Sequence, residues 1–316
     1  MSFRIAPLIV CALAFAAAPY FLPEFNLYQV CLIAGTALVV LGLVVVTGFA
    51  GQVSLAQAAF VALGGYGSAV LHSFWGLPLW IGIPLVSAIV GLLGFVLGLL
   101  TLRVSGHYLA LVTMALTAIV QLGLIYSDPL TGGAAGMPMP SFEMFGFTLS
   151  EGRQLYFAIV PTTAFFFVIV HNLQNSRYGR TLAAIRQSPT AAQAMGIDVL
   201  QFKSLAFGAS AFLGAFGGGI LAVLSTYLDP AQFGIPQSVY FLTVAVVGGL
   251  MSPLGAIVGS VVFVFLPDFL QSFQTYLGLV FALLLLCFIL LRPDGLISLW
   301  QSPRGLVRMI RTGGAN

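Results

Sequence analysis

Charged side chains are scarce in this 316-residue chain, where Asp, Glu, Lys and Arg make up only 6% of the residues and hydrophobic residues make up 60%. Soluble domains carry roughly 25% charged residues, and the mean hydropathy here is +1.08. Because the chain cannot cover itself with a hydrated surface, the composition predicts an integral membrane protein with very little soluble mass. The net charge of +3 does not indicate a nucleic-acid partner, because the basic residues lie at the ends of apolar segments.

Residues that support enzymatic chemistry are equally sparse. The three cysteines, Cys11, Cys31 and Cys287, lie inside apolar stretches, which is typical of small core hydrophobes rather than of disulfides or metal ligands. No metal-ligand cluster and no pairing of a nucleophile with a base stands out in the sequence, which disfavours an intramembrane enzyme. The sequence also lacks the phosphate-binding pattern G-x-x-x-x-G-K-[ST]. We therefore expect no bound cofactor in this chain and no ATP hydrolysis by it alone.

Long apolar runs dominate what is present. A helix needs about 20 apolar residues to cross the hydrocarbon core, and this rule predicts an all-α, polytopic membrane protein with about ten transmembrane helices. The predicted spans are residues 3–22, 27–47, 55–71, 78–101, 107–126, 155–173, 205–228, 239–249, 254–270 and 277–291. The first could instead be a cleaved signal peptide. Pro19 directly follows the small residues that would mark the cleavage site, so we expect this span to be retained.

The distribution of Lys and Arg predicts the orientation, since cytoplasmic loops are enriched in these residues. With ten spans and the amino terminus inside, every basic residue except Arg153 falls on the cytoplasmic side, and every acidic residue except Asp198 and Asp294 falls outside. Both termini are then inside.

This count divides the chain as follows. Residues 1–292 are predicted to form a single transmembrane domain, followed by a short basic cytoplasmic tail at 293–316. Five spans precede an outer loop at 127–153 and five follow it, which predicts an inverted repeat. The outer loop is too long for a mere connection, and we expect it to bind an external partner.

Residues 174–203 form the only long polar break in the sequence that also carries a cluster of positive charge. Leu182 and Ile185 share one helical face, and Ser188 followed by Pro189 predicts the capped start of a second short helix. A glycine is placed to end that helix. Two capped helices beside arginines predict a site where a cytoplasmic partner binds. A loop that binds anionic lipid at the membrane surface is the alternative, and it accounts for the arginines alone.

Polar residues and helix breakers interrupt the spans in two corresponding places, at Gly48 and Gly51 in the first half and at Pro253 and Gly255 in the second. Unpaired amides are costly in hydrocarbon. Polar side chains near these breaks therefore either hydrogen-bond the ends of a broken helix or line a pathway through the membrane, and both readings stay open. The candidate pathway residues are Gln52, Ser54, Gln57, Tyr66 and Gln121.

Two long stretches are GFAGQVSLAQAAFVALGGY at 48–66 and SRYGRTLAAIRQSPTAAQAMGIDVLQFK at 176–203. The first looks like the signature of the permease subunits of branched-chain amino acid ABC transporters of the LivM type, and the second is similar to their cytoplasmic coupling loop. The sequences LTGGAAGM, VVGGLMSPLGAIVGSVVF and LLRPDGL follow the family in the same order.

The resemblance implies a multi-pass subunit of the bacterial inner (cytoplasmic) membrane. Its implied partners are a LivH-like second permease, two cytoplasmic ATPase subunits that bind the ATP, a periplasmic or external substrate-binding protein and the membrane lipid. The implied solutes are branched-chain amino acids or similar small polar solutes. Urea and other small amides or carboxylates are the alternative, because related permeases serve them.

By the same resemblance, residues 174–203 form the ATPase-coupling loop. The implied contact residues are Arg177, Gly179, Arg180, Ala183, Ala184, Arg186, Ala191, Ala192 and Gly196. An acidic residue often precedes the Ala-Ala pair in this family, whereas Thr190 stands here, which puts one ATPase contact in doubt. An ion-driven secondary transporter is the less favoured alternative, because that class often carries charges at mid-span and none is evident in this sequence.

Overall fold

The computed structural model describes residues 22–101, 107–144, 147–148 and 152–269 and a few isolated positions. The first and tenth predicted spans, Cys11, Cys287 and the predicted tail at 293–316 lie outside these stretches. Five of the described helices are long and apolar enough to cross a membrane, and a bent pair of helices is a sixth candidate. The predicted class, a helical protein with several membrane-spanning segments, is therefore confirmed.

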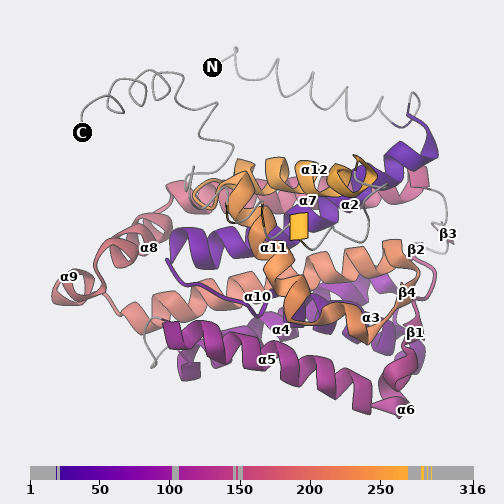
Figure 1. The fold of residues 1–316 in the computed structure, drawn as a ribbon, viewed down its shortest axis with the longest axis horizontal. Coiled ribbons are helices and arrows are strands. Elements are labelled where there is room, and N and C mark those ends of the chain that lie inside the picture. The colour runs from indigo at the N-terminus through magenta and orange to yellow at the C-terminus, as the bar shows by residue number, and fades with distance from the viewer. Residues whose placement is uncertain are drawn as a thin grey trace.

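Helices make up most of the described chain (Figure 1). The longer helices are α2 (Glu24–Leu43), which continues as the π-helical segment η2 (Val44–Phe49), α3 (Gln57–Trp75), α4 (Leu79–Thr101), α5 (His107–Tyr126), α7 (Gly152–Asn175), α10 (Val199–Ser225), α11 (Ile235–Gly248) and α12 (Pro253–Phe269). The shorter helices are α6 (Asp128–Thr131), η3 (Gly133–Ala135), α8 (Arg177–Gln187), α9 (Pro189–Ala194) and η4 (Pro230–Phe233). Two short strand pairs are antiparallel, β1 (Met137–Pro138) with β4 (Tyr227–Leu228) and β2 (Glu143–Met144) with β3 (Phe147–Thr148).

Five predicted spans coincide with membrane-length helices, namely α2 with η2, α4, α5, α7 and α10. The eighth and ninth predicted spans correspond to α11 and α12, which meet at a bend of 116° and so form a broken or re-entrant pair. The third corresponds to α3, which has 19 residues but is too rich in glycine and polar residues to rank with the apolar spans. The ten-span count, the inverted repeat and the inside–outside assignment stay predictions.

The charged residues separate toward opposite ends of the bundle. Among the described residues, the basic ones other than Arg153 lie at the end that carries α8 and α9, which we call the basic end (Figure 1). The described acidic side chains other than Asp198 lie toward the end with the strand pairs and α6, which we call the acidic end (Figure 1). This is the separation that the positive-inside rule describes for the two faces of a membrane.

α10 lies at the centre of the bundle and packs against α2, α3 and α4. A Cβ added to its Gly208 would lie 2.9 Å from the carbonyl oxygen of Gly91 on α4, and one added to Gly217 would lie 3.0 Å from the carbonyl oxygen of Gly35 on α2. Backbones can approach this closely only where side chains are absent. Such contacts replace the hydrophobic driving force that is missing between helices in lipid.

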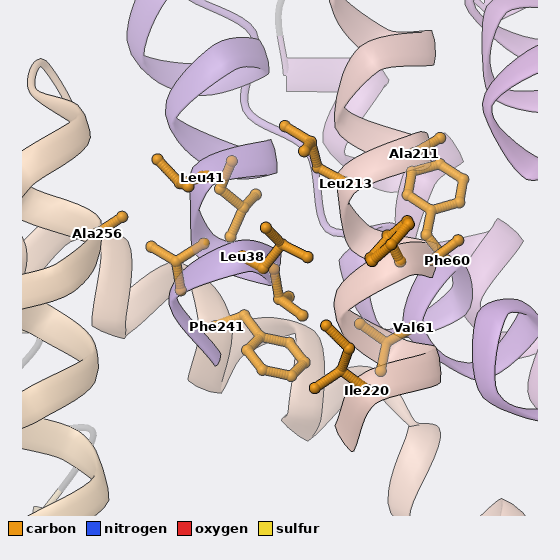
Figure 2. Close-up of a cluster of buried hydrophobic side chains, with 14 of the residues drawn as sticks. Leu38, Leu41, Phe60, Val61, Ala211, Leu213, Ile220, Phe241 and Ala256 are labelled. Atoms are coloured by element: carbon orange, nitrogen blue, oxygen red, sulfur yellow. The ribbon is translucent and has the colours of Figure 1, made fainter. Parts of the chain in front are cut away.

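The side chains between these helices form a continuous apolar core. Figure 2 shows its centre, where Leu38 of α2, Phe60 of α3, Leu213 of α10 and Phe241 of α11 gather. The ring of Phe60 meets that of Phe207 on α10 edge to face, with 5.6 Å between centroids. Because this interior is apolar, each polar group within it needs a partner from the protein itself.

We predict that the close contact between α3 and α10 tolerates no side chain at Gly64. A Cβ on Gly64 would overlap the carbonyl of Ala215, so Gly64→Ala should lower the free energy of unfolding by about 1–3 kcal/mol, the usual cost of overpacking. Gly123→Ala on α5 is the matched control, since a Cβ there meets nothing within 4 Å. Thermal unfolding of both variants in detergent checks this, and equal midpoints would contradict the packing.

Candidate functional site

α8 and α9 form a capped helix pair at the basic end. The Ser188 side chain accepts a hydrogen bond from the backbone N–H of Ala191 at 3.2 Å, and Pro189 occupies the start of α9. Gly196 has φ of +81°, the left-handed conformation in which glycine commonly ends a helix. The backbone N–H of Ile197 then donates to the Ala192 carbonyl in α9 at 3.1 Å. The predicted start and end of this second short helix are confirmed.

One face of the pair is buried against the bundle. Leu182 and Ile185 are buried, and Ile185 packs with Ala192 and Val199 in a small separate core. Gly179 is also buried, and a Cβ on it would overlap carbonyl groups at the end of α7. Of the predicted coupling residues, Gly179 and Ala192 are therefore buried within this chain, where they pack the helix pair against its neighbours.

The opposite face of the pair is exposed. It presents most of the other predicted coupling residues, Arg177, Arg180, Ala183, Ala184, Ala191 and Gly196, whereas Arg186 reaches back to Gly48 and Met251 of the bundle. Met195, which the sequence reasoning missed, is 82% exposed at the end of α9. Thr190 turns its hydroxyl toward Ser188 at 3.1 Å. The exposed face thus combines positive charge, small side chains and one large apolar side chain.

A cavity of about 570 Å³ lies beside α8 at the basic end, lined by residues of α8, of the end of α7 and of the end of η2. Arg186 crosses it and donates from Nη1 to the Gly48 carbonyl oxygen at 2.5 Å, and the same nitrogen contacts Met251 Sδ. Gln174 of α7 donates from Nε2 to the Met251 carbonyl at 3.0 Å. Met251 lies between α11 and α12, so α7 and α8 are both bonded to the residues where helices break.

Residues 50–56, which we call the break segment, connect η2 to α3 without helical structure. The amide of Leu55 donates to Thr113 Oγ1 at 3.0 Å, and the Leu55 carbonyl accepts from Thr117 Oγ1 at 2.7 Å. Both threonines belong to α5. They satisfy backbone groups that lipid could not satisfy, which is why a non-helical segment is stable here.

The start of α3 is tied to three other helices. Gln57 is fully buried, donates from Nε2 to the Val39 carbonyl of α2 at 2.8 Å and accepts from Ser210 Oγ of α10 at 3.2 Å. The amide of Ala58 donates to Ser238 Oγ of α11 at 3.0 Å. The Gln57 amide is therefore used to hold the broken helix.

The remaining polar side chains of the break segment behave differently from each other. Ser54 Oγ accepts a hydrogen bond from the Ala56 amide at 3.3 Å, a local bond within the break segment. Gln52 is only 3% exposed, and neither atom of its side-chain amide has a hydrogen-bond partner among the described residues. An unsatisfied buried polar group costs about 1–3 kcal/mol. Of the predicted pathway residues, Gln52 is the one with hydrogen-bonding capacity to spare in the described structure.

A second cavity, of about 440 Å³, lies among α2, α3, α10, α11 and α12 toward the acidic end. Its polar lining residues are Thr36, Ser225, Tyr227, Gln232, Gln237 and Tyr240. Its apolar wall includes Leu32, Val61, Phe233, Phe241 and Phe263. No described charged side chain lines it. Its volume lies within the range of about 300–1,000 Å³ for small-molecule sites, and its lining suits a small solute with polar and apolar parts.

Tyr66 and Gln121 do not line this second cavity, but they bond to the segment 228–233, which contributes to its wall. The Tyr66 hydroxyl donates to the Leu228 carbonyl at 2.9 Å, and its ring packs edge to face on Phe233; both partners line the cavity. Gln121 donates from Nε2 to the Pro230 carbonyl at 3.3 Å, which holds η4 against α5. The structure therefore places Tyr66 near the cavity and Gln52 near the basic end, in separate places.

The sequence reasoning missed Gln232 and Gln237, the two amide side chains of the second cavity. The available signal was that each closely follows a proline, Pro230 or Pro236, that stands at the start of a helix between two predicted spans. A proline at the start of a helix marks a place where the preceding helix has ended, and amides next to such interruptions tend to face a polar space.

A bundle with broken helices, a capped basic helix pair and an uncharged cavity has the parts of a transport subunit. The chain matches the family described as "Branched-chain amino acid transport system / permease component" over residues 27–290. It belongs to this permease family. The resemblance drawn from the sequence motifs is thereby confirmed.

Three relatives illustrate the breadth of the similarity. The permease is 28% identical over 283 residues to the high-affinity branched-chain amino acid transport system permease protein LivM of Salmonella typhimurium, covering 82% of this chain and 67% of that protein. It is 23% identical over 277 residues to the probable branched-chain amino acid transport permease protein LivH of Methanocaldococcus jannaschii, covering 80% and 86%. It is 27% identical over 247 residues to the ribose import permease protein RbsC of Haemophilus influenzae, covering 75% and 72%. No solved structure matches the chain.

We predict that Gln57 of the permease stabilises the bundle and does not contact solute. Gln57→Leu removes both side-chain hydrogen bonds and leaves the partners on Val39 and Ser210 buried, which should cost about 1–3 kcal/mol of unfolding free energy. Gln201→Leu, an exposed position on α10, should change it by no more than about 0.5 kcal/mol. Thermal unfolding and solute uptake are measured on both. A Gln57→Leu variant of normal stability but weakened solute affinity would assign Gln57 to the pathway.

Proposed function

We propose that the permease is the translocating subunit of an ATP-driven importer in a bacterial inner membrane. Its partners in this proposal are a LivH-like second permease, two cytoplasmic ATPase subunits that bind the ATP and an external or periplasmic solute-binding protein. The basic end faces the cytoplasm, because cytoplasmic loops concentrate Lys and Arg. The observation that carries the proposal is the α8–α9 pair, which is anchored to the bundle on one face and exposed on the other.

The exposed face of α8 and α9 is the proposed ATPase contact. Its small side chains, Ala183, Ala184 and Ala191, let a partner backbone come close, and Met195 extends from the end of α9. Methionine is flexible and fills irregular apolar pockets well. Binding to anionic lipid would explain the arginines, but not a second capped helix that presents an apolar tip. A protein partner therefore fits this surface better.

The solutes in this proposal are branched-chain amino acids or small polar solutes of similar size. The second cavity supports this, because amide and hydroxyl groups on one part of its wall face aliphatic and aromatic side chains on another. A net-neutral solute with an apolar side chain would use both parts. The uncharged lining equally accommodates urea, other small amides or carboxylates paired with a counter-charge. In this proposal an external binding protein selects which of these solutes reaches the permease.

An ion-driven secondary transporter is the competing function. That class often places ionisable groups at mid-membrane, where they bind protons or sodium. In the described part of this chain the charged residues lie in connecting segments or within a few residues of helix ends. This arrangement favours a subunit whose energy comes from a partner.

Reconstitution of the permease with its neighbouring-gene partners in proteoliposomes tests the proposal. We expect uptake to require ATP and both ATPases. We also expect Met195→Gln to reduce ATPase binding. Its thermal stability should not change, because the Met195 side chain is 82% exposed. Loss of a well-packed apolar interface residue typically costs more than about 1 kcal/mol, a several-fold loss in affinity. ATP-independent uptake by the purified permease alone would instead support the ion-driven alternative.

The second cavity yields a separate prediction about solute contact. Gln237→Leu keeps the approximate shape of the side chain and removes one donor and one acceptor from the wall. We expect the uptake kcat/KM to fall about three- to tenfold, as for the loss of one hydrogen bond, with little change in stability. Gln201→Leu is again the control. Uptake of leucine and of urea is measured with each variant, and an unchanged kcat/KM for every transported solute would exclude this cavity from the pathway.

A further inference from the structure

The two helix breaks of the permease meet at the basic end. η2 ends the first membrane-length helix at Phe49, and α11 ends at Gly248 before the bend into α12. Gly48 is packed so closely against the second break that a Cβ on it would overlap the Leu250 carbonyl. Backbone therefore lies directly on backbone, and neither break can shift at this point without displacing the other.

One side chain from α8 hydrogen-bonds to the first break and contacts the second. Arg186 donates from Nη1 to the Gly48 carbonyl oxygen at 2.5 Å and contacts Met251 Sδ. Its aliphatic part covers Gly51, where an added Cβ would lie only 2.8 Å from Arg186 Cγ. Gly51 has φ of +69°, a conformation that favours glycine. Because glycine has no side chain, the carbon stem of Arg186 can lie directly against it. The guanidinium thus bonds to the last turn of η2, and its carbon stem packs on Gly51 of the break segment.

The chemistry of the contact suits a positive charge. Carbonyl groups in the last turn of a helix have no partner within the helix, and the partial negative charge there favours a cation. The π-helical form of η2 is itself uncommon, and such segments occur frequently at functional sites. Immediately beyond it lies Gln52, whose buried amide has no hydrogen-bond partner among the described residues. The environment of Gln52 therefore depends on where Arg186 holds η2.

We propose that Arg186 is the positioning residue that transmits movement of α8 to both helix breaks at once. The proposal rests on the proposed function, because the ATPases supply the movement. When α8 shifts, Arg186 carries the Gly48 carbonyl and the Met251 turn with it, and the break segment that contains Gln52 follows. Such a link biases two states of the pathway only if the ATPases bind those states with different affinity.

Activity of the complete reconstituted importer tests this link. Arg186→Ala should still assemble with the ATPases and hydrolyse ATP at a basal rate, while solute-stimulated hydrolysis and uptake fall at least about tenfold, as for loss of a charge-assisted hydrogen bond. Arg186→Lys should give intermediate uptake, because an ammonium retains the charge but lacks the planar fork. Gln201→Ala, at the same end of the bundle, is the control.

A labelling experiment provides an independent readout that does not need the alanine variant. Val53 of the break segment is 51% exposed, so Val53→Cys, in a background with the native cysteines replaced, can be labelled by an impermeant maleimide. We expect its labelling rate to change on ATP binding with Arg186 present, and to change less with Arg186→Lys. The proposal would be overturned if Arg186→Ala showed normal stimulated hydrolysis and uptake, or if it failed to assemble with the ATPases. It would also be overturned if ATP changed the labelling rate equally with Arg186 and with Arg186→Lys. Failure of the unmodified importer to use ATP would instead overturn the proposed function.

Discussion

A bilayer offers no water to backbone N–H and C=O groups, so any interruption of a helix inside the bundle must be satisfied by neighbouring protein. The rest of this structure depends on that constraint. Thr113 and Thr117 of α5 bond the break segment, and Ser238 of α11 bonds the first turn of α3. Arg186 takes the carbonyl at the end of η2. Each interruption exists only because a distant part of the chain completes it.

The interruptions lie in a bundle that is otherwise packed at backbone contact. Glycines on α10 bring α2, α3 and α4 against it, and the side chains between these helices form one apolar core. Packed interiors have few alternative arrangements. The places where the helices are broken adjoin both the α8–α9 pair and the cavity at the basic end.

The sequence was sufficient for the features that depend on nearby residues. The positions of the five membrane-length helices, the cap at Ser188 and the glycine that ends α9 follow from local composition and spacing, and the family follows from several motifs that occur in the family's order. It was not sufficient where partners are far apart in sequence. The bonds from Gln57 to Val39 and Ser210 join three helices, and nothing local shows that this amide is already used. The wall of the second cavity is likewise assembled from five helices, so the prolines near Gln232 and Gln237 could not show that these two amides face the same space.

The polarity of α3 has a consequence for how the protein is made. This helix carries too many glycines and polar residues to rank among the membrane-length apolar helices, and its first residue is fully buried against α2 and α10. α10 leaves the ribosome long after α3. During biosynthesis the Gln57 amide therefore lacks its Ser210 partner, and α3 lacks its close backbone contact with α10, until α10 has been made.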